Sequence, residues 1–352
     1  MGRGAGRVSP EGRAQVHAPR SRRRAPDLRV RIGSLELANP VMPASGCFGP
    51  ELGQLVDLNG LGALVTKTVF AGPRSGNPAH RLGETYGGML NSVGIPSDGA
   101  AGFVRRLLPE YRKWRPPTIV SLGGLSEEEY FTAADRLAGI DGIAAFEVNV
   151  SCPNLEAGGH ELGAVPSAVE RVIRGVVDRV DVPVIAKLTP NVTSIADIAR
   201  AAEAGGASAV TAINAVLGLA VDARTRKAKI GTTTGGLTGP AIKPIALRCV
   251  WQAARAVRIP VIGVGGIATV DDAIEFLLVG ATAVQVGSAT FTRPDTMQRI
   301  IDGLSARLAA DGIASVRELT GALQVGAANH DLASEGVLDA SASESVSPVP
   351  RG

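Results

Sequence analysis

Short apolar runs rich in β-branched residues alternate along this chain with longer segments whose apolar positions recur at helical spacing. The runs are almost continuously apolar, which is typical of parallel strands covered by helices on one side and by a packed interior on the other. Eight runs occur, so the pattern predicts an α/β fold of the (β/α)8 TIM-barrel class in a single domain. The predicted strands are Pro40–Pro43, Ala63–Thr68, Thr118–Leu122, Ala145–Val150, Val182–Leu188, Ala209–Ile213, Pro260–Val264 and Ala283–Val286.

Two connections between these strands, 69–117 and 214–259, are longer than one helix with its turns. Functional groups in this fold class lie on the loops that follow the strands. We therefore expect both connections to be insertions on the active face. An alternating segment before the first strand, at Leu28–Val30 and Gly33–Leu37, predicts a small hairpin that plugs the barrel floor.

Composition and charge narrow the class of protein. Of 352 residues, 45% are hydrophobic and 20% are charged, as in ordinary globular proteins. The net charge of +3 comes from the first 26 residues, which hold seven Arg and one acid, so the remainder is slightly acidic. This distribution argues against nucleic-acid binding. No stretch approaches the roughly 20 apolar residues of a membrane helix, so we expect no membrane association and a cytoplasmic location.

The same pattern predicts the domain boundaries. A disordered Arg-rich extension is expected at 1–27, a barrel domain at 28–330 and a disordered tail at 331–352.

Glycines follow the seventh and eighth predicted strands, at Gly265, Gly266 and Gly287, the last of which precedes Ser288. Glycine loops at these two positions let backbone N–H groups close on a phosphate. They predict a phosphorylated ligand or cofactor. The alternative is that the glycines only turn tight corners between strand and helix.

Lys67 and Lys187 stand at the ends of predicted buried strands. A lysine in such a place needs an anionic or polar partner, because its desolvation is otherwise costly. Two cations facing one cavity would suit an electron-rich guest such as a flavin. Pairing of either lysine with a structural carboxylate is the alternative.

Asparagines and one cysteine gather on the same predicted face. Asn91, Asn149, Asn154 and Asn214 lie on loops after the strands, and amides suit a ring edge that alternates C=O and N–H, as a pyrimidine does. Cys152 lies between Ser and Pro in a loop, where a thiol could act as a base or as a nucleophile. Three dispersed cysteines show no disulfide framework and no metal-ligand spacing, so no metal site is predicted.

Six ordered motifs resemble class 1 dihydroorotate dehydrogenases, over about residues 28–325. The resemblance implies an oxidoreductase of pyrimidine (UMP) biosynthesis that oxidises dihydroorotate to orotate, with FMN bound in the barrel domain. It also implies that Cys152 is the base that takes a proton while hydride passes to FMN. The motifs are ASGCFG at 44–49, NSVGI at 91–95, NVSCPN at 149–154, KLTPNVT at 187–193, GGLTGPAIKP at 235–244 and GVGGI at 263–267.

The resemblance also assigns the binding residues. Catalytic roles fall to Cys152 and Lys67, and Ala215 replaces a Ser or Thr that often contacts substrate in the family. The implied substrate contacts are Lys67, Asn91, Ser92, Val93, Gly94, Ile95, Asn149, Asn154, Asn214 and the altered position Ala215. The implied FMN contacts are Ser45, Lys67, Thr68, Asn149, Lys187, Ile213, Gly239, Gly265, Gly266, Gly287 and Ser288.

The motifs at 44–49 and 235–244 look most like the heteromeric, NAD-linked subtype (class 1B), whose FMN subunit forms a homodimeric core within a heterotetramer. Its second chain carries FAD and a [2Fe–2S] cluster, for which this chain has too few cysteines. The fumarate-using homodimeric subtype fits less well. Two other flavoenzymes remain as alternatives, a dihydropyrimidine dehydrogenase and a tRNA-dihydrouridine synthase. The few aromatic residues and the acidic barrel domain argue against RNA as substrate.

Overall fold

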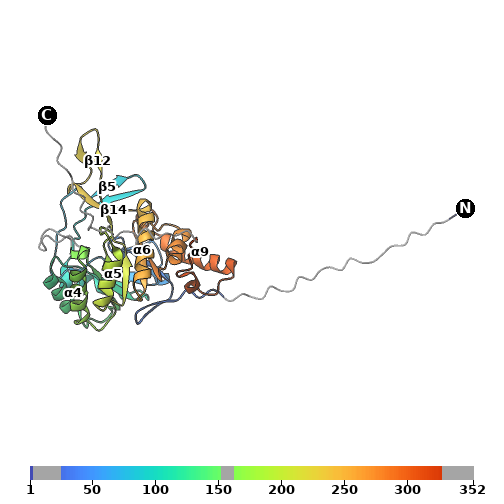
Figure 1. Ribbon diagram of the computed structural model, residues 1–352, viewed down its shortest axis with the longest axis horizontal. Helices are drawn as coiled ribbons and strands as arrows, with labels where there is room; N and C mark the ends of the chain where they lie inside the picture. Colours follow the sequence, from blue (N-terminus) through green and yellow to red (C-terminus); the bar gives the residue numbers. More distant parts are fainter. Residues whose placement is uncertain (3–24, 152–161, 327–352) are drawn as a thin grey trace, which may run out of the picture.

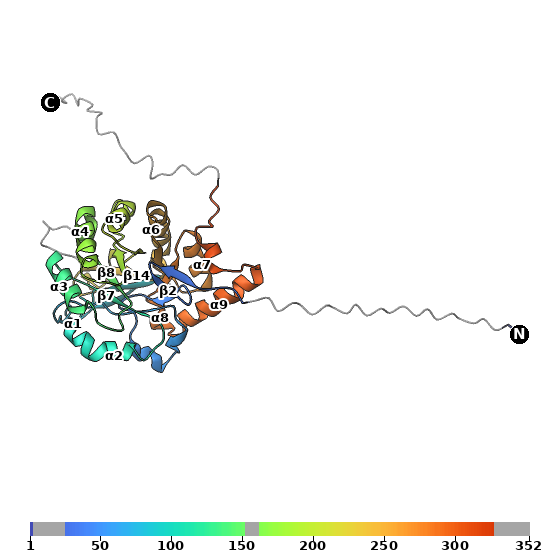
Figure 2. The same cartoon turned by 90° about the horizontal axis from the view of Figure 1, so that it is seen from below.

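The structure is a computed structural model that describes residues 1–2, 25–151 and 162–326 (Figures 1 and 2). Most of the predicted extension at 1–27 and the whole predicted tail at 331–352 lie outside these ranges.

Eight parallel strands form the predicted barrel, in the order β3-β16-β15-β10-β9-β8-β7-β4. The prediction of a TIM-barrel class is confirmed, and each predicted run contains one strand. Between the outer two strands, the N–H of Gly62 donates to the main-chain oxygen of Val41 at 2.8 Å, which brings the barrel close to closure. The strands are β3 (Val41–Pro43), β4 (Leu64–Val65), β7 (Thr118–Leu122), β8 (Ala145–Asn149), β9 (Val184–Leu188), β10 (Ala209–Ala212), β15 (Val261–Val264) and β16 (Ala283–Val286).

Helices surround the strands, as the ring in Figure 2 shows. Three of them begin at side-chain caps, from Ser126, Ser194 and Thr269, which accept backbone N–H groups of the first turn. In the described part of the chain, no helix has the length and apolar character needed to cross a membrane. The helices are α1 (Gly99–Gly102), α2 (Leu108–Tyr111), α3 (Glu127–Leu137), α4 (Pro166–Val177), α5 (Ile195–Ala204), α6 (Lys243–Ala256), α7 (Val270–Leu278), α8 (Ala289–Thr292) and α9 (Thr296–Asp311). A π-helical turn (Phe103–Leu107) joins α1 to α2, and 3-10 turns occur at Pro50–Gln54, Leu58–Gly60, Leu162–Ala164, Pro240–Ile242 and Val316–Leu319.

The two long connections pair with each other. Strands β5 (Leu82–Thr85) and β6 (Gly88–Asn91) come from the first, and β11 (Val216–Leu219) and β14 (Thr234–Thr238) from the second. They form an antiparallel sheet in the order β11-β14-β6-β5, which stands at one end of the barrel (Figure 1). A short hairpin, β12 (Val221–Asp222) with β13 (Lys227–Ala228), extends from the second connection.

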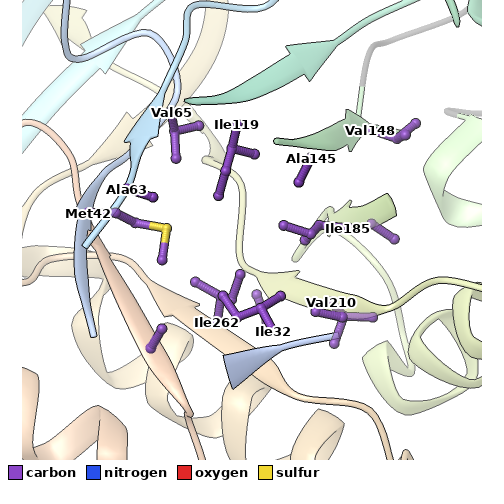
Figure 3. Packing of buried hydrophobic residues seen from close by; sticks show 14 of the residues in the cluster. Ile32, Met42, Ala63, Val65, Ile119, Ala145, Val148, Ile185, Val210 and Ile262 are labelled. Carbon is purple, nitrogen blue, oxygen red and sulfur yellow. The ribbon is translucent and has the colours of Figure 1, made fainter. Parts of the chain in front are cut away.

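A hairpin closes the other end of the barrel, as the alternation at 28–37 predicts. It consists of β1 (Val30–Ile32) and β2 (Leu35–Leu37), and Ile32 is fully buried. At the turn, Gly33 has φ +57°, and a Cβ there would lie 2.9 Å from the Cβ of Ser208, just before β10. Figure 3 shows Ile32 among the side chains of Met42, Ile185, Val210 and Ile262. The floor is therefore a continuation of the barrel core.

Replacing Ile32 with Ala should lower the free energy of unfolding by about 2–5 kcal/mol, because it leaves a cavity in the barrel floor. Denaturant unfolding followed by far-UV circular dichroism measures the change. Leu55→Ala, at a side chain that is 70% exposed, is the matched control and should change stability by about 0.5 kcal/mol or less. Equal midpoints for the two variants would show that the hairpin contributes little to the core.

Candidate active site

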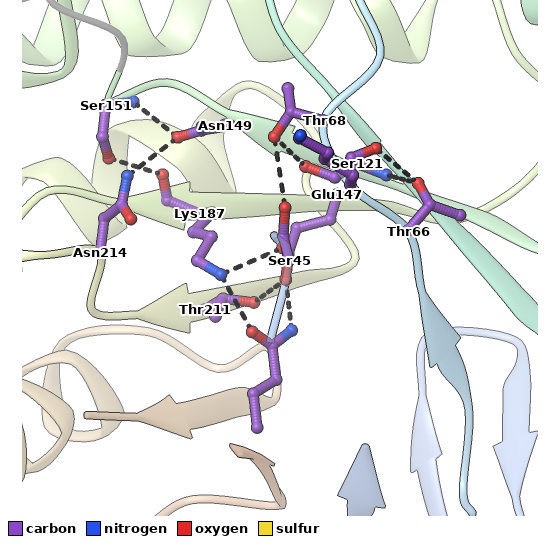
Figure 4. Close-up of polar contacts among 12 residues, drawn as sticks. Ser45, Thr66, Thr68, Ser121, Glu147, Asn149, Ser151, Lys187, Thr211 and Asn214 are labelled. Carbon is purple, nitrogen blue, oxygen red and sulfur yellow. Dashed lines mark hydrogen bonds and ion pairs between the residues drawn. The ribbon is translucent and has the colours of Figure 1, made fainter. Parts of the chain in front are cut away.

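Two of the predicted asparagines meet at the carboxyl ends of the barrel strands. Asn149 ends β8 and Asn214 follows β10, and the Nδ2 of Asn214 donates to the Oδ1 of Asn149 at 3.2 Å (Figure 4). Asn149 is only 7% exposed, and its main-chain oxygen accepts a hydrogen bond from the buried Tyr130 hydroxyl at 2.6 Å. Tyr130 lies on α3, so a helix outside the barrel holds the main chain at Asn149 in position.

Asn91 reaches the same face from the first long connection. It ends β6, and its Nδ2 donates to the main-chain oxygen of Gly236 on β14 at 2.9 Å. A Cβ on Gly236 would lie 2.6 Å from the Cβ of Ala215, so the strand approaches Ala215 at a distance that only glycine allows. Asn191 also donates to the main-chain oxygen of Ala215, at 3.3 Å. The paired long connections thus bring Asn91 and Ala215 together.

The rest of the predicted substrate segment, Ser92 to Ile95, is a tight, half-buried loop. The side chain of Asn77 holds it by donating to the Oγ of Ser92 at 2.8 Å. Gly94 has φ +71°, and a Cβ there would lie 2.3 Å from the N of Asn77. Ile95 has φ +46°, a left-handed conformation that is rare for β-branched residues. The loop therefore has a fixed, strained shape, with Val93 at its centre.

Lys67 follows β4 and is half-buried. Burial lowers the pKa of its ammonium, and the nearby positive charge of Arg81 lowers that pKa further, while Asp98 and Glu51 act weakly in the opposite sense. The Arg81 guanidinium is held in turn by the main-chain oxygens of Asn77 and Ser75. Sequence reasoning missed Arg81, because its distance from Lys67 follows only from the path of the first long connection.

Hydroxyl groups connect two of the predicted cofactor contacts. The Oγ of Ser45, after β3, lies 3.2 Å from the Oγ1 of Thr68, which lies 2.9 Å from the Oγ of Ser121 on β7 (Figure 4). Ser121 is fully buried. It fixes the side chain of Thr68 from inside the barrel wall.

The environment of Lys187 differs from the expectation that its ammonium faces the cavity. Its side chain is nearly fully buried, and the Nζ lies 3.3 Å from the Oε1 of Glu147 and 3.1 Å from the Oε1 of Gln285. The alternative raised for the lysines, pairing with a carboxylate, therefore holds for Lys187, because a buried ammonium requires such a partner. Sequence reasoning missed Glu147, although an acid within the apolar run Ala145–Val150 is a visible signal.

The glycine loops come together around the end of β15. Gly265 and Gly266 have φ +136° and +77°, and Gly239, after β14, has φ +101°. A Cβ on Gly266 would lie 2.9 Å from the main-chain oxygen of Gly239, and one on Gly265 would lie 2.6 Å from the Cβ of Ala246. Ile213 borders the same cluster, with its Cγ1 3.7 Å from the position of a Cβ on Gly265. Among the described residues, no acceptor meets the N–H groups of Gly265 and Gly266.

Gly287 behaves differently from these three glycines. It has no positive φ, and a Cβ there would meet Ala44 and the Cys47 sulfur at 3.6 Å, an ordinary contact distance. Neighbouring protein atoms therefore do not require glycine at this position. Ser288 follows it at the start of α8.

Two predicted residues, Cys152 and Asn154, lie outside the described residues. Of the other cysteines, Cys47 lies beside the site, but burial raises its pKa to about 11, so it remains a neutral thiol at neutral pH. Cys249 is buried on α6. Within the described ranges, no three His, Cys, Asp or Glu side chains gather in a way that could hold a metal ion.

Comparisons with known proteins identify the family. The family model described as dihydroorotate dehydrogenase matches residues 27–308. The chain is 47% identical over 301 residues to the "Dihydroorotate dehydrogenase B (NAD(+)), catalytic subunit" of Trichlorobacter lovleyi, which covers 85% of this chain and 99% of that protein. The chain belongs to the dihydroorotate dehydrogenase family. Proteins with the same name from Geobacter sulfurreducens and Desulforamulus reducens are each 48% identical, over 302 and 298 residues, with 85% and 84% of this chain and 99% and 98% of those proteins covered.

The family resemblance drawn from the six motifs is therefore confirmed, and the chain is an oxidoreductase of the dihydroorotate dehydrogenase type. This finding favours dihydroorotate over the uracil-type and RNA substrates of the two alternative flavoenzymes. The described motifs of the dehydrogenase family lie at the end of the barrel where the amides, Lys67 and the glycine loops converge.

Arg81→Gln should raise the pKa of Lys67 toward its ordinary value, because it removes a neighbouring positive charge. The lowered pKa disfavours the charged lysine in the folded state. Stability should therefore rise with pH between the folded and unfolded pKa values of Lys67, and this rise should shrink in the variant. The pH dependence of Lys67 acetylation, followed by mass spectrometry, measures the pKa directly.

The control for that experiment is Arg299→Gln, which removes an exposed charge from α9. It should leave the acetylation profile of Lys67 unchanged. The same profile in wild type and Arg81→Gln would show that the guanidinium does not act on Lys67.

Proposed function

We propose that this chain is the catalytic subunit of an NAD-linked dihydroorotate dehydrogenase, which binds FMN in the barrel mouth and oxidises dihydroorotate to orotate. The observation that carries the proposal is the convergence of Asn91, Asn149 and Asn214 from three separate elements onto one end of the barrel. Three amides there can both donate to and accept from a ring whose edge alternates C=O and N–H.

The described residues fit a phosphorylated flavin. The loops at Gly239 and Gly266 approach each other at a distance that leaves no space for a Cβ on Gly266, and the N–H groups of Gly265 and Gly266 have no acceptor among the described residues. Such a backbone surface suits a phosphate. At the N-terminus of α7, the capping box already takes up the N–H groups of Thr269 and Asp272.

In this proposal, Ser45, Thr68, Asn149, Lys187 and Ile213 would hold the isoalloxazine, and Gly239, Gly265, Gly266, Gly287 and Ser288 would hold the phosphate end. The bound flavin would accept hydride from the substrate ring. The residues of this chain would bind and orient the substrate and would remove the proton.

Substrate binding would rest on charge and on amide geometry. The ammonium of Lys67, supported by the nearby charge of Arg81, would attract the carboxylate of dihydroorotate. Asn91, Asn149, Asn154 and Asn214 would orient the ring, and the strained loop from Ser92 to Ile95 would close one side of it. Ala215 offers no hydroxyl to the substrate, and its main-chain oxygen already accepts a hydrogen bond from Asn191.

Proton removal would fall to Cys152. As a thiolate it would take a proton from the ring carbon next to the one that loses hydride. Cys47 is unsuited to this task because burial raises its pKa to about 11.

The names of the relatives include NAD(+) and "catalytic subunit", and we infer a second chain from this. That chain would carry FAD and a [2Fe–2S] cluster and would pass electrons to NAD, because the three cysteines of this chain are too few for such a cluster. In the proposed assembly, two copies of this chain form a homodimer at the centre of a heterotetramer.

Anaerobic addition of dihydroorotate to the purified chain should bleach the visible absorbance of its bound flavin, whereas dihydrouracil should not. Cys152→Ser should still bind orotate but should reduce the flavin far more slowly at neutral pH, because a serine hydroxyl is a poorer base. Rapid-mixing absorbance measures the rate, and Cys249→Ala, on the outer helix α6, is the matched control.

Reduction at the wild-type rate in Cys152→Ser would remove Cys152 from the mechanism. Purified chain without flavin, even after incubation with FMN, would refute the proposed function itself.

The identity of the electron acceptor is tested in a separate experiment. The chain alone, after reduction by dihydroorotate, should transfer its electrons to an artificial dye but not to NAD+, because it lacks the second chain. Flavin absorbance measures reoxidation. Rapid reoxidation by NAD+ alone would contradict the need for a partner, and reoxidation by fumarate would favour the homodimeric subtype.

A further inference from the structure

A charged layer crosses the barrel interior beneath the predicted substrate amides. Glu147 lies two residues before Asn149 on β8, and residues two apart on a strand point to the same side. Lys187 on β9 is in register with Asn149 on one side and with Thr211 of β10 on the other. Four strands therefore contribute to this layer, since Gln285 comes from β16.

Glu147 is the centre of the layer. It is completely buried, and both of its carboxylate oxygens accept hydrogen bonds. Its Oε1 faces the Nζ of Lys187 at 3.3 Å, while its Oε2 accepts from the Oγ1 of Thr211 at 2.9 Å and from the Nε2 of Gln285. In Figure 4, Glu147 and Thr211 surround the end of the Lys187 side chain. Each of these three partners lies on a different strand.

The Lys187 ammonium does not depend on a ligand for its charge balance. It has three N–H donors, of which two find Glu147 and Gln285. Its positive charge also reaches the loop after β3, where it lowers the pKa of Cys47 against the larger effect of burial. The Cys47 sulfur lies 3.6 Å from the position of a Cβ on Gly287. The charge of Lys187 therefore acts on loops that the proposed flavin would contact.

We infer that Glu147 is a positioning residue for the proposed flavin site, which holds the Lys187 ammonium in place and limits how much of its positive charge the flavin meets. Charges interact more strongly at buried positions than in water, and both side chains of this pair are buried. A positive charge near the flavin favours its reduced, anionic form. Glu147 should therefore keep the reduction potential of the flavin lower than Lys187 alone would set it. The inference rests on the proposed flavin binding.

Glu147→Gln tests this role, because it keeps the size of the side chain and an oxygen for the Lys187 ammonium but removes the negative charge. The variant should favour reduced over oxidised flavin at least tenfold more than wild type does, which is a positive shift of about 30 mV for a two-electron couple. Anaerobic equilibration with a reference dye measures the potential. Glu147→Asp, which retains the charge, should restore most of the wild-type value.

The matched control is Glu127→Gln. It makes the same chemical change in an exposed ion pair, in which the Oε1 of Glu127 lies 2.7 Å from the Nη2 of Arg171. Its flavin potential should equal that of wild type. An unchanged potential in Glu147→Gln with flavin bound would overturn the inference and leave the proposed function intact.

A second measurement needs no flavin. In the apoprotein, Glu147→Gln and Lys187→Met should each lower the melting temperature, because each leaves one buried charge without its partner. The double variant buries no charge and should melt higher than the less stable single variant. If Glu147→Gln fails to fold while the double variant folds, the charge-balancing role is supported.

The double variant could instead lose as much melting temperature as the two single variants together, or more, or it could fail to fold. Either result would show that Glu147 serves packing alone and would overturn the inference. A wild-type chain that takes up no flavin would instead refute the proposed function, and the apoprotein measurement would still report on the pair.

Discussion

The barrel interior contains a nearly fully buried lysine and a completely buried glutamate, and the arrangement of the site depends on their pairing. Lys187 and Glu147 lie on neighbouring strands, and removal of one partner of such a buried pair typically costs about 3–5 kcal/mol. The pair is formed only if β8 and β9 keep their register, because a slip of one residue in either strand would turn its charged side chain to the other face of the sheet. The same register places Asn149 above the pair, at the mouth. The need to pair Lys187 with Glu147 thus positions both the lysine ammonium and the Asn149 amide.

The mouth itself is built by contacts between segments far apart in the chain. Strand β14 pairs with β6 across about 145 residues, so that Asn91 donates to Gly236 and the loop before Ile95 is held in place. Glycine is required where these backbones approach, as at Gly236 against Ala215 and at Gly266 against Gly239. The long connections are therefore part of the scaffold of the site.

Residues outside the mouth support those inside it. Tyr130 reaches from α3 to the main-chain oxygen of Asn149, Ser121 holds the hydroxyl of Thr68, and Asn77 holds Ser92. None of the three supporting residues belongs to the predicted contacts of substrate or flavin. Their hydrogen bonds restrict the side chains that do, so that a ligand would meet groups that are already oriented.

The barrel could be predicted from the pattern of apolar residues, because eight nearly continuous apolar runs separated by helical segments leave few other ways to bury so much apolar surface. The family could also be predicted, since the motif residues follow the strands in order, and the family model matches residues 27–308. Three features could not be predicted from the sequence. Lys187 pairs with Glu147, Arg81 acts on Lys67, and the two long connections form one sheet. Periodicity reports which side of a strand a residue occupies, whereas these three features depend on distances between segments that are remote in sequence, which only the folded chain defines.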